Sequence, residues 1–178
     1  MKAENIYDLP RINSHFCLKM AFETKNIGTE KAFQKAKYFC AYQERCHAEV
    51  KKKLYSFGLY KNEVELLMSQ LIEENYLNEE RFAMAFAGGK FRINQWGKTK
   101  IKFELKQRQV SDYSIKKALA AIPEDDYEKT LKKLAEEKLA ILKSEKNIFT
   151  RKGKLQNYLV GKGYEFSLVA GLLKDVKI

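Results

Sequence analysis

The sequence Asn75-Tyr76-Leu77-Asn78-Glu79-Glu80-Arg81-Phe82-Ala83 decides the fold, because it ends one helix and begins the next. Asn78 is a good N-cap residue, since its short side chain can accept from the free amides of a first helical turn. Glu79 and Glu80 follow where the helix dipole favours negative charge. Apolar side chains then recur at spacings of three and four, which predicts a helix over residues 78–93.

The same spacing of apolar residues predicts further helices over residues 30–45, 47–57, 97–108 and 124–144. Gly58 is a natural left-handed C-cap for the second of these. Asn62 followed by Glu65 has the polarity of a capping box, so we expect another helix to start there. Pro123 breaks the helix before it, and the acidic residues behind it favour a new helix N-terminus.

Three segments of the chain align with one another without a gap. The first carries apolar residues or glycine at Val50, Leu54, Gly58, Leu59, Val64, Leu67, Met68 and Leu71. The second carries Ile101, Leu105, Gln109, Val110, Ile115, Ala118, Leu119 and Ile122, and the third Leu155, Leu159, Gly163, Tyr164, Val169, Leu172, Leu173 and Val176. Gln109, in place of glycine, leaves the conformation of the middle turn open. The alignment predicts an internal repeat.

We therefore predict an all-α fold built from tandem three-helix repeats. The expected units are residues 29–94, which include a preceding helix, residues 95–146, and a partial C-terminal repeat over residues 147–178. Modules of ~50 residues bury little apolar surface alone, so stacking between neighbours should stabilise them. Residues 1–28 form an expected N-terminal arm, in which residues 15–24 fit either a short strand or an extended segment.

Composition excludes several classes of protein. A hydrophobic fraction of 45% with only two prolines favours a folded helical chain over a disordered one. The longest uncharged runs, residues 82–89 and 166–173, are far shorter than the ~18 residues of a bilayer-spanning helix. Charged residues interrupt the N-terminus, which argues against a signal peptide. We expect a cytoplasmic monomer with no membrane contact.

The sequence shows no pattern typical of a metal site or an enzyme. Cys17, Cys40 and Cys46 are expected to be reduced thiols, because the count is odd and no export signal is present. The cysteines and the two histidines lack paired ligand spacing. The carboxylate pairs fall at helix ends, where capping explains them, and Gly88-Gly89-Lys90 lacks the spacing of a phosphate-binding loop. We predict no metal, no cofactor and no catalysis.

Charge is segregated along the chain, which has a net charge of +11. Residues 62–80 hold six acidic side chains and no basic one, whereas residues 88–117 and 143–162 are mostly basic. This segregation indicates a polyanionic partner or an acidic protein groove. The candidate contact residues, inferred from charge alone, are Lys98, Lys102, Lys106, Arg108, Arg151, Lys152 and Lys154. Phe91, Trp96 and Tyr158 could stack on bases, although aromatic residues at helix junctions more often pack in a core.

Tyr76 to Ala83, together with the helix behind Gly97, resembles the RecX family of regulators of the RecA recombinase. The family pattern runs roughly Tyr-Leu-Asp-Asp-x-Arg-Phe-Ala, followed by Gly-x-x-x-Ile-x-x-x-Leu. Asn78 and Glu79 stand at the two Asp positions, a departure that keeps the N-cap and the favourable charge. The resemblance extends from about residue 29 to the C-terminus.

This resemblance implies tandem three-helix repeats in an elongated, curved shape. It also implies a protein that lodges in the groove of RecA filaments on single-stranded DNA and inhibits their extension or activity. Recombination and the SOS response would be modulated as a result. The alternative from the residues alone is a basic helical module that binds nucleic acid directly, without RecA.

Overall fold

The computed structural model describes residues 26–175, and this part of the chain is helical with no strand. Its elements are α2 (Thr29–Tyr42), α3 (His47–Tyr55), α4 (Lys61–Glu73), α5 (Glu79–Asn94), α6 (Lys98–Gln107), α7 (Asp112–Ala120), α8 (Glu124–Ile141), the 3-10 helix η1 (Leu142–Ser144), α9 (Ile148–Lys162) and α10 (Phe166–Asp175). The possible strand over residues 15–24, and most of the expected N-terminal arm, lie outside the described residues.

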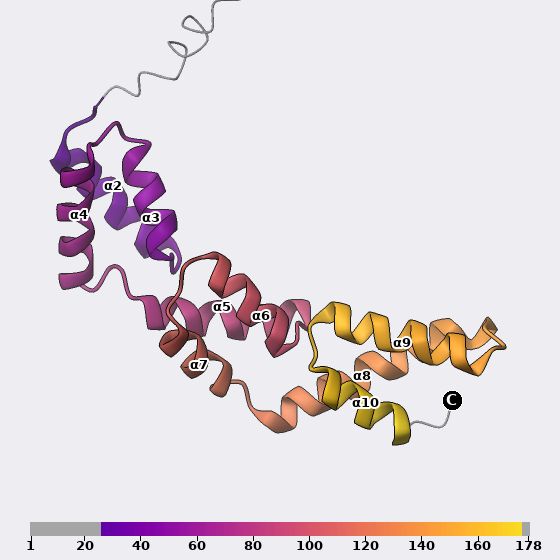
Figure 1. Ribbon diagram of the computed structural model, residues 1–178. Helices are drawn as coiled ribbons and strands as arrows, with labels where there is room; N and C mark the ends of the chain where they lie inside the picture. The colour runs from indigo at the N-terminus through magenta and orange to yellow at the C-terminus, as the bar shows by residue number, and fades with distance from the viewer. Residues whose placement is uncertain (1–25, 176–178) are drawn as a thin grey trace, which may run out of the picture.

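The helices follow one another in triplets along an elongated, curved array (Figure 1). The triplets α2–α4, α5–α7 and α8–α10 each contain one longer helix followed by two others. Helices α3, α6 and α9 lie along the inner edge of the curve in Figure 1. The predicted all-α, repeat-built, curved architecture is confirmed. The division at residues 94 and 146 remains a prediction about which segments fold together.

Equivalent positions of the three aligned segments are buried alike. Val50, Ile101 and Leu155, one from each segment, are all 0% exposed. The next aligned position, one helical turn on, is also fully buried in each repeat, at Leu54, Leu105 and Leu159. The repeat therefore sets the core of each triplet, because the same apolar pattern meets the same surroundings.

The middle turn has the same backbone conformation as the other two. Gly58, Gln109 and Gly163 have φ angles of 78°, 59° and 95°, all in the left-handed region. A residue with a Cβ pays about 1–2 kcal/mol for that conformation. The turn is thus maintained at Gln109 by the surrounding fold, which answers the question that the sequence left open.

Two helix starts show how well local signals predicted the boundaries. The Asn78 side chain accepts from the Arg81 amide at 2.9 Å, as expected of an N-cap. The expected start at Asn62 is wrong, because α4 begins at Lys61 with Tyr60 at the N-cap. The Tyr60 amide donates to the Glu63 carboxylate at 2.7 Å, so Glu63 rather than Glu65 caps the helix.

The apolar core is divided into two clusters. One lies within α2–α4, whereas the other runs without interruption through α5–α10. Cys46, ahead of α3, packs into the larger cluster and so joins the two parts of the array. Arg81 adds a polar tie, because its guanidinium donates to Glu44 at 2.5 Å and to the Asn75 carbonyl at 3.0 Å.

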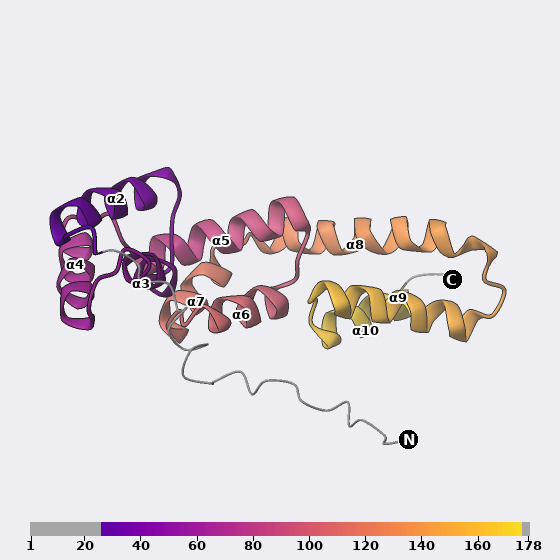
Figure 2. The ribbon, with the colours of Figure 1, turned by 90° about the horizontal axis from the view of Figure 1, so that it is seen from above.

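The second and third triplets meet through backbone groups. The Gly97 amide donates to the Lys162 carbonyl at 2.9 Å, and the Thr99 amide donates to the Gly163 carbonyl at 3.1 Å. A Cβ on Gly97 would overlap the backbone of Gly163 and Tyr164. The start of α6 therefore abuts the end of α9, and Figure 2 shows the two helices in one row.

Tyr127 of α8 fills this joint and is fully buried. Its hydroxyl accepts from the Lys98 amide at 2.8 Å and donates to the Glu165 carboxylate at 2.7 Å. Its ring lies against Phe91 and Tyr164, with centroid separations of 5.8 and 5.0 Å. Desolvation raises the pKa of Tyr127 far above its ordinary value, so its hydroxyl stays a donor.

Stability should fall at high pH because of this buried hydroxyl. The folded state keeps the Tyr127 proton, whereas the unfolded chain loses it near the ordinary pKa of 10.0. Unfolding then releases a proton, so the free energy of unfolding should drop by about 1 kcal/mol between pH 10 and 11. Urea denaturation across this range should show a shallower fall for Tyr127→Phe. An equal fall in both proteins would contradict the assignment.

Candidate functional site

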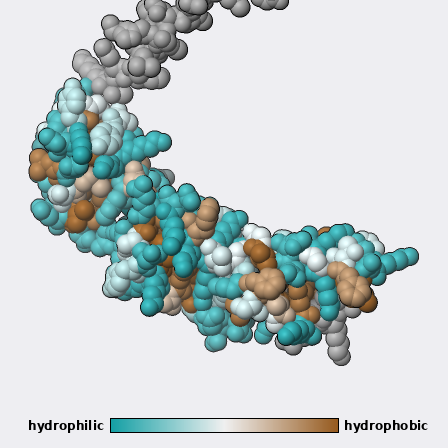
Figure 3. Space-filling view, viewed as in Figure 1, coloured by the Kyte–Doolittle hydropathy of each residue, from teal (hydrophilic) through white to brown (hydrophobic). Residues whose placement is uncertain are grey.

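Positive charge is concentrated on the helices of the inner edge. Helix α9 carries Arg151, Lys152, Lys154 and Lys162 and no acidic residue. Helix α6 carries four lysines against Glu104, and α3 carries three lysines against one glutamate. The outer helix α4, by contrast, has one lysine and three glutamates. Figure 3 shows a mainly hydrophilic surface with separate hydrophobic patches.

Lys98 makes contacts within the fold that occupy its side chain. Its ammonium pairs with Glu124 at 2.5 Å and lies 4.5 Å from the centre of the Tyr127 ring. Only 20% of its side chain is exposed. Lys98 therefore fastens α6 to α8, and little of its charge faces solvent.

Lys102 and Lys106 are exposed and line one groove between α6 and α7. The groove has a volume of about 390 Å³ and is lined by Lys102, Lys106, Asp112, Ile115, Lys116 and Leu119. Lys106 pairs with Asp112 at 3.2 Å, whereas Lys102 and Lys116 make no ion pair within residues 26–175. The groove is thus lined by three lysines, one aspartate and two apolar side chains. Lys116 was not among the predicted contact residues.

Arg108 belongs to a different cleft. Its guanidinium binds the Glu104 carboxylate at 2.7 Å and the Glu104 carbonyl at 2.8 Å, and it lies over the Phe86 ring. It lines a cleft of about 330 Å³ together with Glu44 and Glu49 of the first triplet. The positive charge of Arg108 is therefore balanced by nearby acidic side chains.

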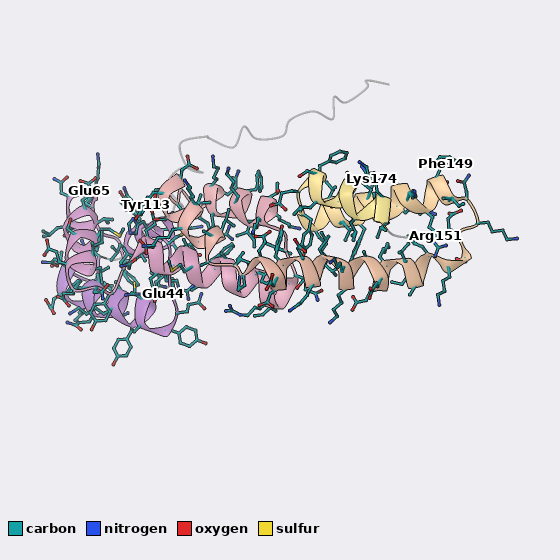
Figure 4. All side chains as sticks on the ribbon, turned by 90° about the horizontal axis from the view of Figure 1, so that it is seen from below. Glu44, Glu65, Tyr113, Phe149, Arg151 and Lys174 are labelled. Carbon is teal, nitrogen blue, oxygen red and sulfur yellow. The ribbon has the colours of Figure 1, made fainter. Side chains whose placement is uncertain are left out.

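Arg151, Lys152 and Lys154 lie at the far end of α9, well away from α6 (Figure 1). Lys154 pairs with Glu145 at 2.6 Å, and this contact lowers the pKa of the Glu145 carboxyl. Arg151 lies on the side of α9 that faces α8 (Figure 4), and its Nε is buried without a hydrogen-bond partner. The structure places the α6 and α9 clusters on consecutive helices of the inner edge, but apart from one another.

The three aromatic residues named from the sequence are largely packed. Phe91 is buried, whereas Trp96 and Tyr158 are half-buried against the larger core. Lys90 and Lys100 lie over the Trp96 ring, 5.0 and 4.6 Å from its centre. Packing, the more common role considered for these residues, is what the structure shows.

Neither a metal cluster nor a reactive thiol is present in the described part of the chain. Residues 26–175 contain no group of three His, Cys, Asp or Glu side chains suited to an ion. Cys40 and Cys46 are buried, and desolvation raises the pKa of Cys40 to about 11. Its thiolate is therefore scarce at neutral pH. Among the same residues, no helix combines the length and apolarity needed to cross a membrane.

Known proteins are similar to this chain both in sequence and in the arrangement of the helices. Residues 78–119, which span α5–α7, match the family model described as RecX, second three-helix domain. A Regulatory protein RecX from Clostridium perfringens (strain 13 / Type A) is 31% identical over 127 residues, 71% of this chain. The chain belongs to the RecX family. A Regulatory protein RecX from Bacillus thuringiensis (strain Al Hakam) is 25% identical over 158 residues, 85% of this chain.

The RecX fold extends beyond the matched domain. The crystal structure of RecX from Lactobacillus salivarius superposes with a TM-score of 0.74 at 22% identity, covering 83% of this chain and 95% of that one. A second crystal structure, of regulatory protein RecX, superposes with the same TM-score, and the superposed region covers 72% of that chain. The chain spans 59% and 56% of the lengths of the C. perfringens and B. thuringiensis RecX proteins.

Proposed function

We propose that this chain binds RecA filaments on single-stranded DNA and inhibits their extension or activity, thereby modulating recombination and the SOS response. The observation that carries the proposal is membership of the RecX family, whose relatives are named regulatory proteins. We expect it to act as a monomer in the cytoplasm, without a cofactor and without catalysis of its own.

The curved array with its basic inner edge supports this role physically. Helices α3, α6 and α9 occupy equivalent positions along the curve (Figure 1), and in each of them basic residues outnumber acidic ones. An array of linked units can contact several filament protomers at once, and such multivalency raises affinity without one strong patch. Among the seven predicted contact residues, the geometry favours Lys102, Lys106 and Lys152, because they make no ion pair or keep much of their charge exposed.

Charge reversal in the α6–α7 groove tests the proposed contact. Lys102→Glu combined with Lys106→Glu should weaken inhibition of the DNA-dependent ATPase of RecA roughly tenfold, because two negative side chains would then face an acidic surface and be repelled by it. Helicity measured by circular dichroism should be unchanged, since both side chains are exposed.

Lys129→Glu with Lys133→Glu is the matched control, because these lysines have the same spacing on α8 and are also exposed. Inhibition should survive in this control. Equal loss in both double variants, or no loss in the α6 variant, would remove the α6–α7 groove from the interface.

A salt titration separates the regulator from a module that only binds DNA. Affinity for naked single strands should fall with salt in proportion to the phosphates neutralised, with a logarithmic slope of about 0.7 for each. The regulator should still saturate RecA filaments at a salt concentration where naked strands no longer bind. Equal binding to filaments and naked strands at both concentrations would favour the DNA-binding module.

A further inference from the structure

The far end of the array exposes apolar side chains that the fold does not use. Ile141, Ile148 and Phe149 are 71%, 52% and 86% exposed, although helices α8 and α9 bury other apolar residues nearby. Phe149 lies on the side of α9 that is turned away from α8 (Figure 4). We define residues 141–152, which close the α8–α9 hairpin, as the tip. Figures 1 and 2 show the tip at one extreme of the molecule.

The same tip carries two lysines that make no ion pair within the described residues. Lys143 and Lys146 are exposed and make no ion pair with any residue from 26 to 175. The single acidic residue of the tip, Glu145, is already paired with Lys154 at 2.6 Å. The first turn of α9 contains no acidic side chain either. An incoming anion would therefore meet positive charge and a favourable helix N-terminus.

An exposed aromatic ring and two unpaired amines on the same tip suit one class of ligand in particular. Single-stranded nucleic acid offers unstacked bases with phosphates between them, so it can use the ring and the amines together. A duplex keeps its bases stacked and would use the amines alone. An acidic protein surface would pair with the amines but has no nucleobase to stack on the ring.

We propose that the tip binds single-stranded nucleic acid, with a base stacked on Phe149 and adjacent phosphates on Lys143 and Lys146. The stacking contact and the lysine contacts can be distinguished by what their binding free energy depends on. Stacking depends on the presence of the base, whereas the lysine contacts depend on backbone charge and salt. The proposal goes beyond the filament contact, because Lys143, Lys146 and Phe149 are not among the predicted contact residues and the ligand needs no RecA.

Two fluorescein-labelled probes of equal length and charge separate these contributions. One is an oligothymidylate of about 15 nucleotides, and the other is an abasic phosphate backbone of the same length. Fluorescence anisotropy with the full chain should show a preference of about tenfold for the thymidylate. Phe149→Ala should abolish this preference without weakening binding to the abasic probe, and Phe149→Trp should restore it.

Phe166→Ala is the matched control, because Phe166 is also an exposed phenylalanine, 63% exposed, at the start of α10. It should keep the wild-type preference. Lys143→Gln with Lys146→Gln should weaken binding to both probes and reduce the salt slope by about 1.4, the contribution of two phosphates.

Several results would overturn the proposal. These are equal wild-type affinity for the two probes, a preference that survives Phe149→Ala, or an equal loss in Phe166→Ala. Phe149-dependent binding to phosphatidylserine vesicles without any base preference would assign the tip to a lipid surface instead. RecA is absent from this assay, so its failure would leave the test of ATPase inhibition unaffected.

Discussion

Gly97→Ala should lower the free energy of unfolding by about 3 kcal/mol, at the upper end of the usual cost of overpacking. The new Cβ would overlap the carbonyl of Gly163 and the amide of Tyr164. These are backbone atoms fixed by the hydrogen bonds between the start of α6 and the end of α9, so they cannot rotate away. The joint between the second and third triplets must open to admit the methyl group.

Urea denaturation followed by circular dichroism measures this loss. Gly89→Ala is the matched control, because a Cβ at Gly89 would meet nothing within 4 Å and the residue lies inside α5. Alanine should stabilise that helix by up to about 1 kcal/mol. If Gly97→Ala were as stable as wild type, the close backbone contact at the joint would be refuted.

Tyr127→Ala should cost about 3–5 kcal/mol, the range for removing a buried aromatic side chain. Its ring fills the space between Phe91 and Tyr164, and its hydroxyl satisfies Lys98 and Glu165. Tyr127→Phe keeps the ring and loses only the hydroxyl. It should cost about 1–3 kcal/mol, because a partly buried amide and a partly buried carboxylate lose their partner.

The same denaturation experiment compares these variants with Tyr113→Ala. Tyr113 is 70% exposed, so its removal should change stability by no more than about 0.5 kcal/mol. A small effect of Tyr127→Ala, similar to that of Tyr113→Ala, would show that the joint does not depend on this residue.

Much of the fold could be predicted from sequence because the determinants are local and repeated. Helical spacing and the N-cap at Asn78 act within a few residues, and three copies of one apolar pattern reinforce each other. The cap of α4 was placed two residues late, because Asn62 and Glu65 have the polarity of a capping box, whereas the observed cap is the Tyr60 amide bonded to Glu63.

The candidate site was less predictable, because charge in a sequence does not show which charges are paired. Lys98 looked available, yet its partner Glu124 is 26 positions away. Lys116 lines the groove only because α7 folds beside α6. Phe149 gave no signal either, since an apolar residue near a helix start usually packs inward, and only its exposure in the structure distinguishes it.

The division of the apolar core has a mechanical consequence. Helices α5–α10 share one continuous interior, whereas α2–α4 have their own and touch the rest mainly through Cys46 and Arg81. Bending of the molecule should therefore occur mainly at one hinge, next to the start of α5. The six helices α5–α10 should move together as a rigid unit. If the chain occupies the groove of a filament as proposed, a change in the pitch of that filament should be followed mainly by rotation of the first triplet.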